Sequence, residues 1–370
     1  MNAPFDPPPL RSHVSPAAPP RERGRAFGQA QAGPVAATLA GYRAFWDGRA
    51  GAPVDPRPFG RAAREATRAF APHLAEEMEG IAEGAGLDPD MIGALNARTE
   101  ILAVIRARTG GAVPVAGRDP DRGECSAVVA LRPGAAPVMV QTWDWYHRFR
   151  DSWLVWHIEH EDGRITRTLT EYGILGKAGV NDRGVGLLFT ILRHEADGAG
   201  GGVPVHVAAR AALDLAPNLY NAAELLASAP VSASSSLNLA GWDGSRGQAI
   251  TVELSPAGPG YVLPDAAGLL VHTNHFLDPR LAARDVEPRV HPDTLLRRDL
   301  LQRELAGGAH DAEAALSALD SHLGGDSATC CHRADPQAED EYETLATVTL
   351  DLAAGGIAVH PGGPCTRPRG

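Results

Sequence analysis

The chain has 370 residues, of which 44% are hydrophobic and 21% are charged. This composition is typical of folded globular proteins, and the length allows one large domain or two ordinary ones. The longest apolar runs, such as residues 152–156, fall far short of the roughly 18 residues that suggest a membrane span, so we expect no membrane association. The 34 basic and 45 acidic residues give a net charge of −11, which disfavours a nucleic-acid partner because phosphates need a basic surface.

The first 33 residues are rich in proline and lack the apolar segment behind a positive start that marks a secretory signal. We therefore expect residues 1–33 to be a disordered arm without a signal peptide. The chain has four cysteines, two of them adjacent, which are too few for a disulfide framework at this length. Their number fits a reducing compartment and predicts a cytoplasmic protein.

Apolar residues over residues 34–108 recur at helical spacing, interrupted by proline and glycine near residues 52–60. Asp88 is placed as the N-cap of the last helical run, with Pro89 at its first position. Residues 109–124 are rich in glycine, proline and charge and follow neither the helical nor the strand period, which predicts a loop. Residues 34–124 are thus expected to form one mostly helical segment.

From residue 125 onward the pattern changes to strands. Several strand-like runs follow one another up to about residue 193, and then helical runs, strands, helices and strands again alternate along the chain. Such runs predict an α+β fold, an αββα sandwich of two antiparallel sheets between helical layers, rather than a parallel α/β fold. We expect residues 125–370 to form one domain together with residues 34–124.

Two polar residues in these strands are candidates for chemistry. Cys125 lies where the loop meets the first strand, which suits a nucleophile, although a free cysteine more often packs as a small hydrophobic residue. Asp144 is flanked by Trp143 and Trp145 in an apolar strand, where a carboxylate is seldom placed without a partner. It either holds a nearby ammonium group or caps a turn, and the pattern leaves both roles open.

Histidine and cysteine groups raise the question of a metal. His272 and His275 are three residues apart, so in a strand they face opposite sides, and no matching ligand motif lies nearby in the sequence. His157 and His160 fail for the same reason. Residues 330–332 (Cys-Cys-His) have no spacing that would let them wrap one ion, so we expect Cys330 and its neighbour to be buried structural thiols. We predict no metal and no cofactor.

Several segments, taken together, resemble one known family. In chain order they are EMEGIAEGAGL, ALNARTEIL, ECSAVVA, QTWDW, TEYGILGKAGVNDRGVGL, GVPVHVAARAALD, ITVELSP, LVHTNHF and TCCHR. Across residues 77–335, in order and spacing, the chain resembles the acyl-coenzyme A:6-aminopenicillanate (isopenicillin N) acyltransferase family. That family is a self-cleaving branch of the N-terminal-nucleophile (Ntn) cysteine hydrolases, so the resemblance implies the αββα Ntn fold.

The resemblance also implies site residues. It puts a self-cleavage between Glu124 and Cys125, after which Cys125 is the N-terminal nucleophile. Asp144 corresponds to the aspartate of the family's W-D motif, and Asn274 to the asparagine of its H-T-N-H motif, which the family uses as an oxyanion-hole donor. Ser126 stands where threonine is the usual neighbour of the nucleophile, a departure that bears on substrate range more than on chemistry.

The chemistry of an N-terminal cysteine agrees with this role. A thiol with a pKa of about 8.5 is only partly ionised at neutral pH, and an α-amine of pKa about 7.7 to 8.0 on the same residue can accept its proton. Asp144 would orient the resulting ammonium, and Asn274 would donate an N–H to the tetrahedral oxyanion. Lys177, the only lysine beside 33 arginines, either supports the site or substrate through a compact ammonium contact or is an ordinary surface lysine.

We therefore expect an autoproteolytic acyltransferase or amidohydrolase that carries an acyl group as a thioester on Cys125. The motifs leave open whether the acceptor is water or an amine, and whether the donor is an amide or acyl-coenzyme A, which would then be a substrate. The expected partners are the two fragments of the cleaved chain and a small acyl compound. The alternative from another class is a non-catalytic Ntn-like scaffold that binds a small molecule or peptide and stays uncut.

Overall fold

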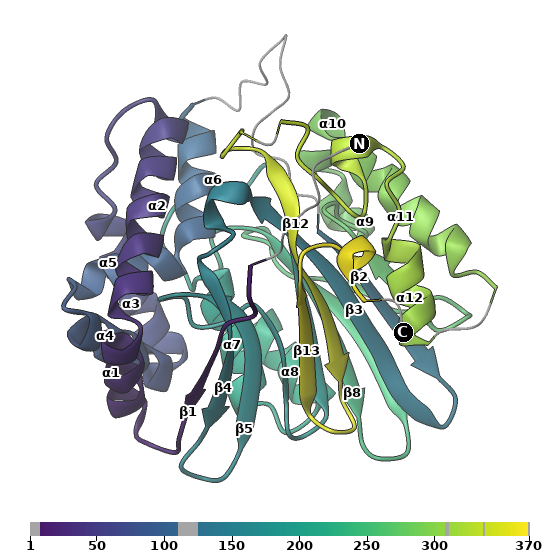
Figure 1. Ribbon diagram of the computed structural model, residues 1–370, viewed down its shortest axis with the longest axis horizontal. Helices are drawn as coiled ribbons and strands as arrows, with labels where there is room; N and C mark the ends of the chain where they lie inside the picture. The colour runs from purple at the N-terminus through teal and green to yellow at the C-terminus, as the bar shows by residue number, and fades with distance from the viewer. Residues whose placement is uncertain (1–7, 110–124, 308–310, 336, 369–370) are drawn as a thin grey trace.

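The computed structural model describes residues 8–109, 125–307, 311–335 and 337–368 (Figure 1). Its strands form two sheets. The large sheet has eight strands, in the spatial order β1 (Ser12–Ser15), β4 (Trp153–Glu159), β5 (Ile165–Glu171), β6 (Ala178–Asn181), β7 (Val185–Ile191), β8 (Ser235–Trp242), β9 (Gly247–Leu254) and β10 (Gly260–Val262). The small sheet has five, in the order β11 (Leu269–His272), β2 (Ser126–Arg132), β3 (Ala135–Tyr146), β12 (Tyr342–Asp351) and β13 (Gly356–Pro361).

The helices fall into three groups (Figure 1). The N-terminal group is α1 (Pro20–Ala30), α2 (Ala32–Ala50), α3 (Arg57–Phe70), α4 (Pro72–Ala85), α5 (Pro89–Asn96) and α6 (Arg98–Arg108). The middle pair is α7 (Val205–Leu215) and α8 (Leu219–Ala227). The third group is α9 (Pro279–Ala282), α10 (Glu287–Val290), α11 (Asp293–Glu304) and α12 (Ala312–Leu319), and three short 3-10 turns are η1 (His147–Phe149), η2 (Gly325–Ser327) and η3 (Pro364–Thr366). The N-cap predicted at Asp88 is present, because its side chain accepts from the Asp90 N–H.

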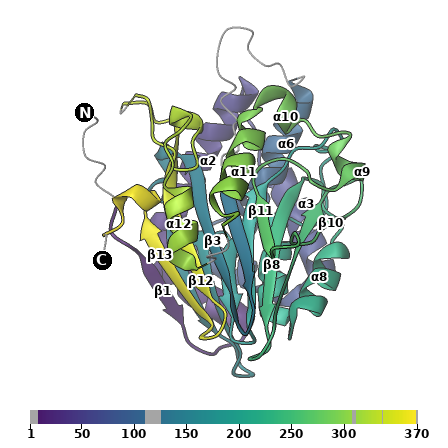
Figure 2. The same ribbon diagram turned by 90° about the vertical axis from the view of Figure 1, so that its right-hand side faces the viewer.

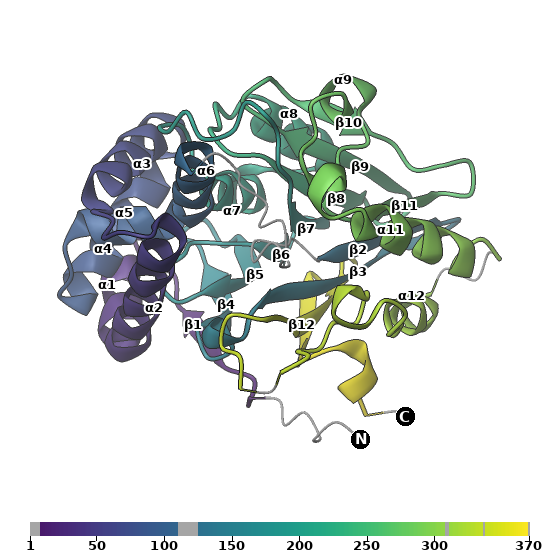
Figure 3. The same cartoon turned by 90° about the horizontal axis from the view of Figure 1, so that it is seen from above.

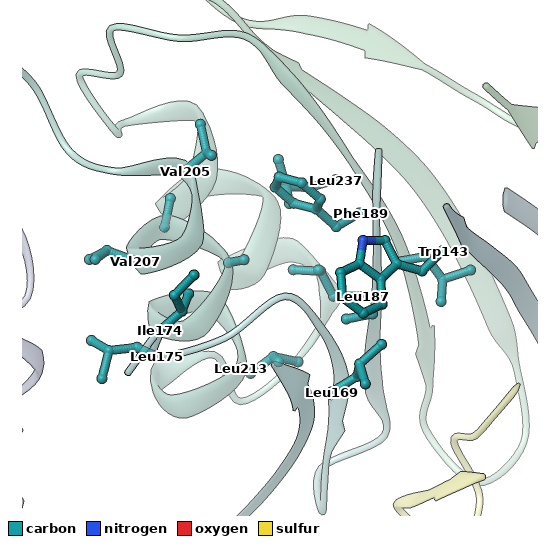
Figure 4. Packing of buried hydrophobic residues seen from close by; sticks show 14 of the residues in the cluster. Trp143, Leu169, Ile174, Leu175, Leu187, Phe189, Val205, Val207, Leu213 and Leu237 are labelled. Atoms are coloured by element: carbon teal, nitrogen blue, oxygen red, sulfur yellow. The ribbon is translucent and has the colours of Figure 1, made fainter. Parts of the chain in front are cut away.

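The two sheets pack face to face between helices, as the predicted αββα sandwich requires (Figures 1 and 3). Helices α7 and α8 contact the large sheet, whereas α11 and α12 contact the small one. Alternating residues of β2 divide between the two sides of the small sheet: Val129 joins the inner core between the sheets, while Val128 and Ala130 join the cluster under α11 and α12. Figure 4 shows the inner core continuing from Trp143 through Leu187 and Phe189 to α7.

A side chain also ties the sheets together across the core. Gln141 of β3 is buried and accepts the backbone N–H of Phe189 in β7 at 3.0 Å. Its amide also donates to the Phe189 carbonyl. Because a buried amide costs free energy unless it is hydrogen-bonded, this pair fixes β3 against β7 at one position. Phe189 lies next to the site described below.

The prediction of a disordered arm over residues 1–33 is wrong for residues 8–33, the part that the structure describes. Strand β1 adds to the large sheet beside β4, and Phe27 of α1 stacks on Trp156 with ring centroids 4.2 Å apart. The prediction took a high proline content as a sign of disorder. Pro20, however, stands in the first turn of α1, where a proline is compatible with the start of a helix. The β1–β4 pairing is parallel, so the large sheet is not purely antiparallel as predicted.

Glycines explain how α1 docks. Gly24 and Gly28 of α1 lie against α4, where Gly80 and Gly84 face back toward α1. A Cβ added at Gly24 would lie 2.2 Å from the Glu77 carbonyl oxygen, so only glycine permits this approach. The two helices therefore pack backbone to backbone, and Phe27 of α1 is part of the core.

Candidate active site

Strand register brings the predicted site residues together. In the small sheet β2 lies between β11 and β3, and it is antiparallel to both. Ser126 is opposite Thr142 in β3, and Ala127 is opposite His272 in β11. Continuing both antiparallel registers past the start of β2 places Cys125 beside the Trp143–Asp144 pair on one side and near Asn274 on the other. Three segments far apart in the sequence thus meet at one end of the small sheet.

A small pocket occupies this meeting point. It is lined by Arg98, Cys125, Trp143, Asp144, Trp145, Phe189, Ile191 and Asn274. The three residues predicted as catalytic are all in its wall, together with residues of β7 from the other sheet. The Cys125 thiol donates to the Asp144 carbonyl at an Sγ–O distance of 3.8 Å. Glu124, the other half of the predicted cleavage site, lies outside the described residues.

Asn274 is held from both ends of its amide. Its Nδ2 donates to the Ile191 carbonyl at 3.0 Å, and its Oδ1 accepts from Arg297 Nη2 at 3.1 Å. The arginine fixes which end of the amide carries the oxygen, so the Nδ2 group is turned toward Ile191 in the pocket wall. One of the two Nδ2 hydrogens is used by Ile191, and the other is available for a ligand oxygen.

Arg297, from α11, joins the two sides of the site. Its Nη1 donates to the Cys125 carbonyl at 3.1 Å and to the Ser126 hydroxyl at 3.0 Å. The same guanidinium contacts Asn274 through Nη2 and lies 3.5 Å from Asp293. A planar fork with several donors can hold the backbone of Cys125 and the side chain of Asn274 in one geometry.

Lys177 is not a surface lysine, since its side chain is 1% exposed. Its Nζ lies 2.7 Å from Glu171 Oε2 and 3.9 Å from the centre of the Trp143 ring, which is in the pocket wall. Glu171 is also paired with Arg98, 3.0 Å away, and accepts the Tyr42 hydroxyl. The compact ammonium thus lies between a carboxylate and an aromatic face.

Burial sets the protonation states in the site. Burial raises the pKa of the Cys125 thiol to about 12, and the charge of Asp144 adds to the rise. Burial also lowers the pKa of Lys177 to about 7, against the opposing effect of Glu171. For Glu171, burial acts to raise the pKa, but the charges of Arg98 and Lys177 outweigh it and the pKa is lowered. In this structure, in which Cys125 follows Glu124 in an intact chain, the thiol is therefore protonated at neutral pH.

Protein side chains contact three of the histidines considered for a metal. His272 is buried, and its Nε2 lies 2.9 Å from Glu253 Oε1. His275 is buried too, with Nδ1 3.0 Å from the Thr294 hydroxyl. His160 contacts the Thr166 hydroxyl and Asp214. Cys331 is buried against backbone carbonyls of residues 326 and 342, as expected of a structural thiol. Cys330 instead contacts His332 and Cys365.

Sequence reasoning missed Arg98, Glu171 and Arg297. Arg98 and Glu171 stand within segments that carried the family resemblance, so those segments held the signal without assigning a role. Arg297 is adjacent to Arg298 in a strongly polar helical run, and nothing in that pattern separates a buried arginine from an exposed one.

One pocket thus brings together the Cys125 thiol, the Asp144 carboxylate and the Asn274 side-chain amide, and comparisons with known proteins identify the family of the chain. The family model described as "Acyl-coenzyme A:6-aminopenicillanic acid acyl-transferase" matches residues 131–364. The chain is 26% identical, over 295 residues, to the acyl-coenzyme A:6-aminopenicillanic-acid-acyltransferase 40 kDa form of Emericella nidulans, covering 79% of this chain and 76% of that protein. The solved structure of penicillin V acylase from Agrobacterium tumefaciens is similar at 14% identity with a TM-score of 0.40, covering 63% of this chain and 82% of the other.

The protein is thus an enzyme of the acyl-transfer class. It belongs to the acyl-coenzyme A:6-aminopenicillanic acid acyl-transferase family, as its sequence motifs predicted. Among the described residues, no helix is long and apolar enough to cross a bilayer.

Proposed function

We propose that the chain is an autoproteolytic cysteine acyltransferase or amidohydrolase that cleaves itself before Cys125 and then carries acyl groups on that residue. The observation that carries the proposal is the pocket in which Cys125, Asp144 and Asn274 meet, since the family resemblance implies a catalytic role for each of them. Family membership supports acyl transfer as the reaction class. The self-cleavage and the thioester rest on the chemistry of the site.

In the maturation step, the Cys125 thiol adds to the carbonyl carbon of Glu124, and its proton passes to the departing amide nitrogen. The C–N bond breaks and a thioester between Glu124 and the Cys125 sulfur forms. Water then hydrolyses this thioester, which leaves a carboxylate on Glu124 and a free thiol and amine on Cys125. Because burial raises the thiol's pKa to about 12, the intact chain would react slowly until a base takes the proton.

In the mature enzyme the new α-amine of Cys125 accepts the thiol proton and the thiolate attacks the acyl carbonyl. Asn274 would stabilise the oxyanion through the Nδ2 hydrogen that Ile191 does not use. The leaving amine or thiol takes the proton from the α-ammonium, an acyl thioester remains on Cys125, and water or an amine completes the transfer. Asp144 would orient the ammonium. The base, the nucleophile and the oxyanion donor of this cycle all come from the chain itself, so the proposed chemistry needs no metal at Cys125.

Buried ion pairs support the proposal that the two fragments stay together after cleavage. Arg210 of α7 lies 3.2 Å from Glu77 of α4, and both side chains are fully buried. Arg98 of α6 pairs with Glu171 of β5, again inside the core. Separating the fragments would expose or strand these charges, which is costly. The partner of each fragment is therefore the other fragment.

The substrate is a small acyl compound, and the site alone does not select between an amide donor with water and acyl-coenzyme A with an amine. The four cysteines are free thiols, which supports a reducing, cytoplasmic location. The rival function, a non-catalytic scaffold that stays uncut, shares the pocket but requires no reaction at Cys125.

A panel of acyl amides and acyl-coenzyme A thioesters tests the proposal. Wild-type protein and the Cys125→Ala variant are mixed with each compound, with and without an amine acceptor. We expect wild-type turnover and a transient mass increase equal to the acyl group on the fragment that begins with Cys125. Binding without turnover or acylation across the panel would favour the scaffold instead.

A further inference from the structure

Four side chains that can ligate a metal lie close together in the last fifty residues of the chain. They are His322, Cys330, His332 and Cys365, and their ligand atoms all lie within 4.8 Å of one another. His322 follows α12, Cys330 and His332 stand between η2 and β12, and Cys365 is in η3 near the end of the chain. The residues that line the pocket around Cys125 are different ones.

Four of the six distances between ligand atoms lie within about 0.4 Å of the edges of a tetrahedral zinc site. With Zn–S bonds of about 2.3 Å and Zn–N bonds of about 2.05 Å, a tetrahedron has edges of about 3.8 Å between sulfurs, about 3.6 Å between sulfur and nitrogen and about 3.3 Å between nitrogens. The Cys330 and Cys365 sulfurs are 3.4 Å apart, and the His322 and His332 Nε2 atoms are 3.2 Å apart. His332 Nε2 lies 3.6 Å from the Cys330 sulfur and 3.3 Å from the Cys365 sulfur.

We propose that His322, Cys330, His332 and Cys365 bind one zinc ion in a structural site. Two thiolates and two imidazoles are a donor set that selects zinc, and four protein ligands leave no open position for a substrate. Zinc would displace protons from the two thiols when it binds. The site goes beyond the proposed acyl transfer, which uses none of these residues.

The arrangement of the chain explains why the Cys-Cys-His run alone did not suggest a metal. The run contributes only its first and third residues, while Cys331 turns to backbone carbonyls of the core. The other two ligands are His322, which follows α12, and Cys365 of η3, and α12 and η3 lie side by side (Figure 2). The expectation that Cys330 and its neighbour are both structural thiols is therefore retained for Cys331 and replaced for Cys330.

A zinc ion here would fasten the C-terminal segment to the strand that backs the active site. The Cys331 N–H donates to the Thr344 hydroxyl at 2.9 Å, and the Thr344 N–H donates to the Cys331 carbonyl at 3.0 Å. Thr344 of β12 is the register partner of Asp144 in β3. The proposed site thus cross-links the segment that leads into β12, next to a residue of the candidate active site.

Metal content of the purified full-length chain tests the proposal. The protein is produced in zinc-supplemented medium, purified in reducing buffer without chelators, and analysed by inductively coupled plasma mass spectrometry. We expect one zinc per chain in the wild type and near none in Cys330→Ser and Cys365→Ser. The matched controls Cys331→Ser and Cys125→Ala should keep their zinc. His322→Ala, which changes an exposed side chain and should fold normally, should bind zinc more weakly.

Cobalt gives a second readout that needs no variant. After zinc is removed, Co²⁺ added to the wild type should produce the visible and near-ultraviolet absorption of a tetrahedral ion with thiolate ligands, and Zn²⁺ should abolish it. Removing zinc should lower the melting temperature by roughly 5 °C, because a ligand bound only to the folded state stabilises it. A zinc-free wild type, a zinc content in Cys330→Ser and Cys365→Ser equal to that of the wild type, or a Cys330–Cys365 disulfide in the reduced preparation would each overturn the proposal.

Discussion

Replacing Glu171 with glutamine should destabilise the fold strongly, because this carboxylate neutralises two buried cations. Its Oε2 lies 2.7 Å from Lys177 Nζ and 3.0 Å from Arg98 Nη2, and the side chains of all three residues are at most 1% exposed. Breaking a buried ion pair by removing one partner costs about 3 to 5 kcal/mol. Arginine keeps its charge at any accessible pH, so the loss of the Arg98–Glu171 pair determines the decrease in the free energy of unfolding at pH 7. We expect a free energy of unfolding lower by about 3 kcal/mol at pH 7.

Lys177 should make the loss depend on pH. Its pKa is lowered to about 7 in the folded protein, and removing Glu171 would lower it further, whereas the unfolded chain keeps the ordinary value. At pH 5 the wild type gains from the protonated Lys177–Glu171 pair, while the folded variant must hold a neutral lysine that the unfolded chain would protonate. The variant therefore loses about 2 kcal/mol more at pH 5 than at pH 7.

Urea unfolding at pH 5 and pH 7 measures both effects, with all variants carrying Cys125→Ala so that the chain stays in one piece. Glu159→Gln, on the exposed end of β4, is the matched control and should change stability by less than about 0.5 kcal/mol. Adding Lys177→Met to Glu171→Gln should remove the extra loss at pH 5. A Glu171→Gln loss below about 1 kcal/mol, or one independent of pH, would refute this account of the buried network.

Asn274→Ala should lower turnover by about 10²- to 10³-fold in protein that is already cleaved, the usual cost of losing one oxyanion donor; near-normal turnover with a reduced melting temperature would make Asn274 a structural residue instead. Lys177→Arg should cost about 1 to 3 kcal/mol, because the larger group must fit a closed site under Trp143, and an unchanged urea midpoint would contradict this packing. The rate of self-cleavage should rise with pH from 6 to 9, because the thiol of the intact chain has a pKa of about 12 and its thiolate fraction keeps growing over that range. Turnover of the mature enzyme should instead level off near pH 8, where the α-amine is deprotonated; parallel profiles would argue against separate bases for the two steps.

Periodicity and turn residues were enough to predict the layered fold, because strands and helices occur in separate runs. They failed for the N-terminal residues, where proline content was taken as disorder. The docking of α1 depends on Gly24 and Gly28 approaching α4, and such a contact leaves no periodic signal in the sequence. The composition of a segment therefore predicts disorder correctly only when the segment does not pack against another part of the chain.

The site could be predicted in part because family motifs mark Cys125, Asp144 and Asn274, whose proximity then follows from strand register. The buried charged residues Arg297 and Glu171 were not predicted, because the type of a charged residue does not indicate whether its side chain is buried or exposed. The cluster that includes Cys330 was missed because its ligands come from three separate segments. Spacing along the chain detects a metal site only when the ligands are local.

The N-terminal sequence of the fragments tests the central claim most directly. Scaling the 38.8 kDa chain by the residues on each side of the bond before Cys125 gives fragments of about 26 and about 13 kDa. After incubation at neutral pH, we expect both fragments to co-purify, the larger one to read Cys-Ser-Ala-Val, and Cys125→Ala to remain full length and inactive. A wild-type chain that stays intact, or is cut elsewhere while retaining turnover, would contradict the proposed mechanism.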